Sequence, residues 1–89
     1  MHEQAVMRDL VGRVLDVARA EGASRVTRVQ VRLGALSHFT PDHFREHFAD
    51  SARGTPADGA AVDATLSDDA TDTEAAGVVL ESVEVEVPG

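Results

Sequence analysis

Residues 25–34, RVTRVQVRLG, form the segment of the sequence that most clearly predicts a β-strand. Apolar and polar side chains take turns along this segment, as they do in a strand with one buried face. The apolar members are Val29, Val31 and Leu33, and the polar members are Arg28, Gln30 and Arg32. Val26 is out of phase with this set, which predicts an irregular start, and Gly34 ends the strand.

An amphipathic helix is expected on each side of this strand. Apolar residues recur every three or four positions through residues 4–20, and Gly22 then suits a left-handed helix cap. Residues 40–52 begin with Thr-Pro, a favourable N-cap followed by a favourable first helical residue. Phe39 and Phe44 have the spacing of a hydrophobic staple across the start of this second helix.

Two further strands and a loop complete the chain. Residues 60–66 alternate again, and residues 78–87 form the last strand. One phase of the last strand holds Val79, Val83, Val85 and Val87, and the other phase holds Val78 and Leu80. This split predicts either that both faces of the strand are covered near its start or that a bulge lies between the two sets of residues. Residues 67–77, SDDATDTEAAG, lack large apolar side chains, so we expect a flexible acidic loop there.

The order of elements predicts the fold class. A chain of 89 residues has one modest core, so we expect a single domain over residues 1–89. Its limited apolar material is buried most economically in an α+β fold, a small three-stranded sheet with two amphipathic helices packed on one face.

Composition excludes several classes of function. The chain has 8 basic residues, all arginine, against 16 acidic ones, and its net charge of −8 argues against a nucleic-acid footprint. It contains no cysteine, so a disulfide framework and a cysteine-type structural zinc site are excluded. No apolar run approaches the ~20 residues that span a bilayer, and no secretory signal is apparent. We therefore expect a cytoplasmic protein without a membrane partner.

The N-terminal tripeptide Met1-His2-Glu3 is a candidate metal site. The terminal amine, the amide nitrogen of His2 and its imidazole can close adjacent chelate rings around one ion, and the amide of Glu3 can fill a fourth position. Deprotonated amides favour a square-planar field, which suits Ni(II) or Cu(II). Taken alone, a histidine at position 2 is more often an ordinary terminal residue.

Three histidines form a weaker metal candidate, namely His38, His43 and His47. His43 and His47 lie four residues apart on the expected second helix, a spacing that can chelate a divalent ion. The segment reads HFREH rather than HExxH, so a metalloprotease is excluded. The alternative is that these are half-exposed residues of the helix surface. No nucleophile or phosphate loop is evident, and we do not expect an enzyme.

Several segments together resemble the HypA/HybF family of nickel metallochaperones. They are Met1-His2-Glu3 before a helix, VTRVQVRLGALS at 26–37, a helix opening at Pro41, GTPADGAAVDATL at 54–66, and LESVEVEV at 80–87. The resemblance implies a nickel site at Met1, His2 and Glu3. It also implies a HypB-type maturation GTPase as partner and a nickel-enzyme precursor, a [NiFe]-hydrogenase large subunit or urease, as recipient.

The chain departs from this family between its last two strands. Members carry there a zinc domain built on two CxxC pairs, whereas this chain has the acidic residues 67–77, so zinc is not expected. The function that we predict is nickel delivery by ligand exchange. The alternative is an interaction or regulatory module of the maturation machinery that has lost metal delivery. The sequence leaves the oligomeric state open.

Overall fold

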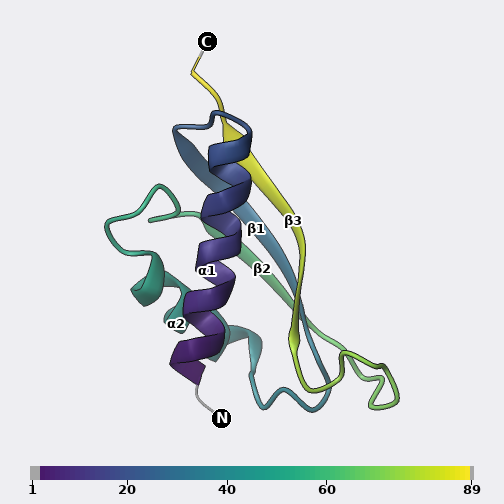
Figure 1. The fold of residues 1–89 in the computed structure, drawn as a ribbon. Coiled ribbons are helices and arrows are strands. Elements are labelled where there is room, and N and C mark those ends of the chain that lie inside the picture. Colours follow the sequence, from purple (N-terminus) through teal and green to yellow (C-terminus); the bar gives the residue numbers. More distant parts are fainter. Residues whose placement is uncertain (1–2, 89) are drawn as a thin grey trace.

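The computed structural model describes residues 3–88, with side chains from residue 4 onward. The elements are α1 (Glu3–Ala20), β1 (Arg25–Leu33), α2 (Pro41–Ala52), β2 (Ala61–Leu66) and β3 (Val78–Glu86). The three strands form one sheet, and both helices cover the same face of it (Figure 1). The predicted α+β class and its layering are confirmed.

The middle strand of the sheet is β1, in the order β2-β1-β3. It pairs parallel with β2 and antiparallel with β3. A parallel neighbour requires a crossover connection, and α2 supplies it between β1 and β2. Strand β1 therefore carries both ladders, and its sequence alternates because one of its faces is buried under the helices and the other is polar.

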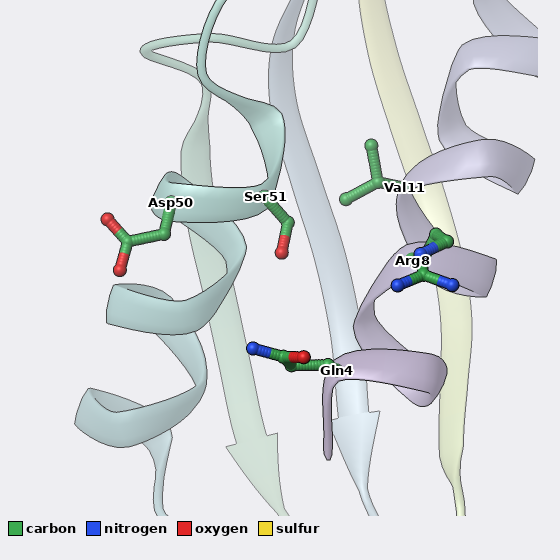
Figure 2. Close-up of a pocket in the computed structure, with 5 residues that line it drawn as sticks. All are labelled: Gln4, Arg8, Val11, Asp50 and Ser51. Atoms are coloured by element: carbon green, nitrogen blue, oxygen red, sulfur yellow. The ribbon is translucent and has the colours of Figure 1, made fainter. Parts of the chain in front are cut away.

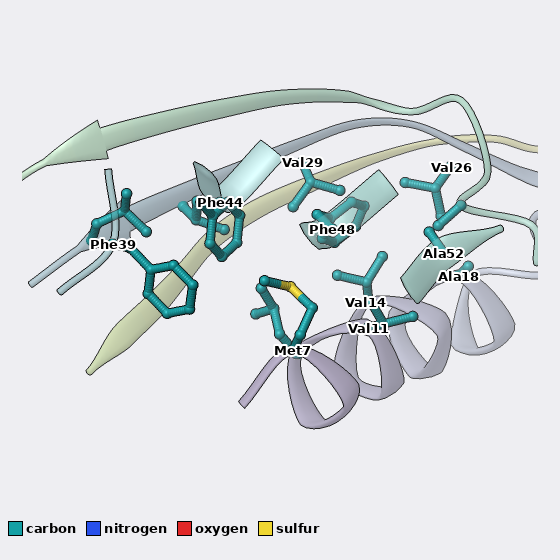
Figure 3. Close-up of a cluster of buried hydrophobic side chains, with 14 residues drawn as sticks. Met7, Val11, Val14, Ala18, Val26, Val29, Phe39, Phe44, Phe48 and Ala52 are labelled. Carbon is teal, nitrogen blue, oxygen red and sulfur yellow. The ribbon is translucent and has the colours of Figure 1, made fainter. Parts of the chain in front are cut away.

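The core lies between this sheet and the two helices (Figure 3). The central strand contributes four side chains that are at most 1% exposed, namely Val26, Val29, Val31 and Leu33. Helix α2 contributes Phe44 and Phe48, and α1 contributes the apolar stripe that includes Met7 and Val14. All belong to one contiguous cluster, so the helices and the sheet share a single core.

Two bulges reconcile the apolar pattern with this core. The β1–β3 register shifts between Val26 and Arg28, so an extra residue there turns Val26 inward. This shift is the irregular start that the phase of Val26 predicted. A second register shift lies further along the same pair of strands. Gln30 pairs with Ser82 and Val31 pairs with Leu80, so Glu81 of β3 is the extra residue. The bulge alternative for the last strand is confirmed.

The bulge at Glu81 corrects one prediction. It brings Val78 and Leu80 onto the core face together with Val83 and Val85. Grouping Val79 with that face was wrong, because alternation reverses across a bulge. Grouping Val87 with it was wrong because β3 ends at Glu86. Val79 is outside the core cluster, and Val87 follows the strand and is 53% exposed.

The acidic loop at 67–77 is attached to the segment that follows β1. The backbone amide of Leu36 donates to the carbonyl of Ala75 at 2.7 Å, and that of Gly34 donates to the carbonyl of Gly77 at 2.9 Å. Ala75 is 5% exposed. A Cβ at Gly34 would lie 2.1 Å from the oxygen of Ala75, so only glycine permits this approach. The flexibility of the loop stays a prediction.

A local turn orders the middle of the loop. The side chain of Asp69 accepts hydrogen bonds from the Thr71 hydroxyl at 2.6 Å and the Thr71 amide at 3.0 Å. These bonds, the hydroxyl first, lower the pKa of Asp69 from its ordinary value. Such an Asx turn gives backbone groups local partners without an apolar core.

Within the part of the chain that the structure describes, neither helix combines the length and the apolar character needed to cross a membrane.

Candidate metal centre

The predicted nickel motif is only partly within the described residues. Met1 and His2 lie outside them, and Glu3 is the first residue of α1, with no description of its side chain. The assignment of Met1, His2 and Glu3 as ligands therefore stays a prediction. The structure does describe the residues around the first turns of α1, which begins at Glu3.

A shallow hollow of about 410 Å³ lies between the first half of α1 and the end of α2. Gln4, Arg8 and Val11 line it from α1, and Asp50 and Ser51 line it from α2 (Figure 2). Polar groups thus border the hollow, and Val11, which also belongs to the core cluster, marks where it adjoins the core.

Arg8, which lines this hollow, differs from the other seven arginines of the chain. Seven arginines lie within ion-pair distance of a carboxylate, for example Arg13 with Asp9 at 3.0 Å and Arg53 with Asp50 at 2.7 Å. Among the described residues, Arg8 has no such partner. Nothing in the sequence distinguishes Arg8, because its spacing to Gln4 and Val11 is that of any helix surface.

The structure brings His43 and His47 together. Their rings stack with centroids 4.4 Å apart and 21° between the planes. His43 is exposed and His47 is half-buried, in agreement with their predicted place on the helix surface. They satisfy the shared-face prediction that the spacing of four residues made.

The start of α2 fixes the position of these rings. The Thr40 hydroxyl accepts a hydrogen bond from the His43 amide at 3.2 Å, which is the predicted N-cap. The Phe39 and Phe44 rings meet edge to face with centroids 5.5 Å apart, which is the predicted staple. The Phe39 ring also lies 5.9 Å from that of His43.

His38 does not complete a three-histidine site with this pair. It lies exposed in the loop before α2 with a φ of 68°, in the left-handed region. Among the side chains that the structure describes, residues 4–88, no three His, Cys, Asp or Glu come together in a group that could hold a metal ion. The pair His43 and His47 is therefore the part of the predicted cluster that the fold assembles.

The opposite face of the sheet is polar and carries ion pairs instead of a site. Arg28 of β1 reaches Asp63 on β2 and lies 4.0 Å from Glu84 on β3. The hydrogen bond to Asp63 and the two negative charges raise the pKa of Arg28 above its ordinary value. This arrangement matches charge across the three strands.

Comparison with known proteins identifies the family. The family model described as "Hydrogenase/urease nickel incorporation, metallochaperone, hypA" matches residues 1–68, which include the N-terminal tripeptide, both helices and the first two strands. The chain belongs to the HypA family. The predicted resemblance is thereby confirmed, and the match ends where the acidic loop begins.

Individual HypA proteins support this assignment. Hydrogenase maturation factor HypA of Methanopyrus kandleri is 42% identical over 60 residues, covering 67% of this chain and 42% of that protein. The HypA of Chlorobium limicola is 40% identical over 63 residues, covering 71% of this chain and 54% of that protein. The chain spans about half the length of the curated relatives that it matches.

The fold agrees with a solved HypA structure. The solution structure of the Ni metallochaperone HypA from Helicobacter pylori superposes with a TM-score of 0.78 at 18% identity, covering 99% of this chain and 100% of that one. At this identity the likeness establishes the HypA fold of the chain.

Proposed function

We propose that this HypA-family chain carries Ni(II) at Met1, His2 and Glu3 and passes it to a nickel-enzyme precursor, a [NiFe]-hydrogenase large subunit or urease. The observation that supports the proposal most directly is the family match over residues 1–68, which contains this tripeptide. A HypB-type GTPase is the proposed partner in delivery, and nickel is cargo rather than a resident cofactor.

The chemistry of the tripeptide suits a carrier. The terminal amine, the amide and imidazole nitrogens of His2 and the amide of Glu3 are four nitrogen donors for a planar ion. A planar complex leaves both axial positions open, so an acceptor ligand can bind before a donor ligand leaves. Transfer by ligand exchange then needs no unfolding of the domain.

Proton release accompanies binding at such a site. The imidazole and the amide nitrogens bind the ion only after losing a proton, so the affinity for Ni(II) falls as the pH drops through the histidine range. A local fall in pH, or an acceptor that competes for the ion, would therefore favour release.

Calorimetric titration of the untagged chain with Ni(II) tests the proposal. We expect His2→Ala to lower the affinity of the terminal site by at least an order of magnitude, because it removes both the imidazole and the chelate ring that the imidazole closes. A two-residue extension before Met1 should have a similar effect, because it moves the amine away from His2. His38→Ala is the matched control, since it removes an exposed imidazole outside the tripeptide.

Two results would contradict nickel carriage at this site. The first is an unchanged affinity in His2→Ala. The second is a pale octahedral spectrum of the Ni(II) complex in place of the yellow colour of a planar one. Equal binding of a HypB-type GTPase with and without nickel, and with His2 replaced, would support the alternative interaction module.

A further inference from the structure

We propose that His43 and His47 form a second metal site, a two-imidazole site on α2 for a divalent transition ion such as Ni(II). The site uses no residue of the N-terminal tripeptide, so it does not depend on the function proposed above. Imidazole is a suitable ligand for nickel, copper and zinc, which defines the class of ion.

The geometry of the pair supports shared coordination. Imidazole nitrogens bind such ions at about 2.0–2.1 Å, so two rings on one ion have centroids roughly 4.5–5.5 Å apart. The rings of His43 and His47 already lie 4.4 Å apart. Coordination requires them to splay from their stack by rotation about χ2, a torsion that is broad for histidine. The helix backbone does not have to move.

The helix that carries the pair is firmly held. Phe44 and Phe48, which alternate with the histidines along α2, are at most 1% exposed and anchor the helix in the core. The amide of His43 is itself held by the Thr40 cap at 3.2 Å. The backbone of both ligands is therefore already ordered before an ion binds.

The charge near the pair favours a cation. Glu46 lies next to His47 and one turn from His43, and it is exposed. Among the described residues Glu46 forms no ion pair, whereas Asp42 pairs with Arg45 and Asp50 pairs with Arg53. An unneutralised carboxylate at this position attracts a divalent ion without being required as a ligand.

The pair lies on the edge of α2 that flanks the start of α1. Ser51 of α2 and Gln4 of α1 line the same hollow (Figure 2). His47 is one turn before Ser51 and His43 is two turns before it, on the same side of the helix. Both helices begin at the same end of the molecule (Figure 1). An experiment must therefore separate this site from the N-terminal one.

Titration of four forms of the chain with NiCl₂ separates the two sites. We expect the unmodified chain to bind two Ni(II) ions, and the double variant His43→Gln, His47→Gln to bind one. The chain extended by two residues before Met1 should keep one ion, and the extended double variant should bind none. His38→Gln is the control and should still bind two.

A second measurement needs no substitution. Paramagnetic Ni(II) added to the extended chain should broaden the imidazole NMR signals of His43 and His47 and leave those of His38 sharp. Two ions bound by the double variant, or equal broadening at all three histidines, would overturn the site. If the unmodified chain binds only one ion and the double variant binds none, the site on α2 stands and the function proposed above is contradicted.

Discussion

The two faces of β1 are stabilised by different physics although they belong to the same nine residues. The face toward the helices holds valine and leucine side chains that are at most 1% exposed. The other face holds Arg28, Gln30 and Arg32, each of which reaches a polar partner on a neighbouring strand. Burial of apolar area is worth about 25 cal/mol per Å², whereas exposed ion pairs contribute about 0–1 kcal/mol each. The core face therefore supplies stability, and the outer face supplies charge matching across the strands.

The largest effect on stability should follow from truncating a side chain on the core face of β1. Leu33 is 0% exposed, and Leu33→Ala should lower the free energy of unfolding by about 2–5 kcal/mol through lost burial and a residual cavity. Urea denaturation measures this loss. The control is Leu36→Ala, at a leucine 52% exposed, which should change stability by no more than about 0.5 kcal/mol. Similar losses in both variants would contradict the contrast.

An intermediate effect is expected from substituting Gly34, the residue that follows β1. Gly34→Ala directs a Cβ at the backbone of Ala75 and Glu74, so the acidic loop must shift, at a cost of about 1–3 kcal/mol. Thermal and urea unfolding, with limited proteolysis of residues 67–77, would detect the change. Gly12→Ala is the control, because a Cβ in that helix meets nothing within 4 Å and should stabilise the chain by about 0.5–1 kcal/mol.

The smallest effect should come from the outer face. Arg32 lies 3.0 Å from Glu81 and 3.8 Å from Asp72, and its side chain is 36% exposed. A double-mutant cycle with Arg32→Ala and Glu81→Gln should give a coupling of about 0.2–1 kcal/mol that shrinks in high salt. A coupling above the loss in Leu33→Ala would reverse the ranking of the two faces.

The sequence predicted most of the fold because its signals are local. Helix α2 shows this most clearly, since its N-cap Thr40 and its Phe39–Phe44 staple are set by spacing within five residues. For the last strand, the sequence left two alternatives open, a bulge or cover on both faces. Alternation along one strand does not show which of its residues stays unpaired in the ladder, here Glu81. The hollow that contains Arg8 was missed, because it is formed by two helices far apart in sequence.

For the candidate sites, the sequence supplied ligand types and the fold supplied proximity. It named Met1, His2 and Glu3 from chelate chemistry, and it placed His43 and His47 on one helix face, a local consequence of the 3.6-residue period. Whether His38 joins them depends on a loop conformation, and the fold leaves it outside any three-ligand group of the described residues.

What the sequence alone determined is therefore the set of elements, the N-cap of α2 and the apolar face of β1, since each follows from side-chain period and backbone preference over a few residues. Only the tertiary structure decided that β1 is central, with β2 parallel and β3 antiparallel to it. It alone also decided that the acidic loop lies against Gly34 and that the first half of α1 and the end of α2 border one hollow. These features depend on contacts between segments distant in sequence, whose free energy is gained only when the whole core is packed.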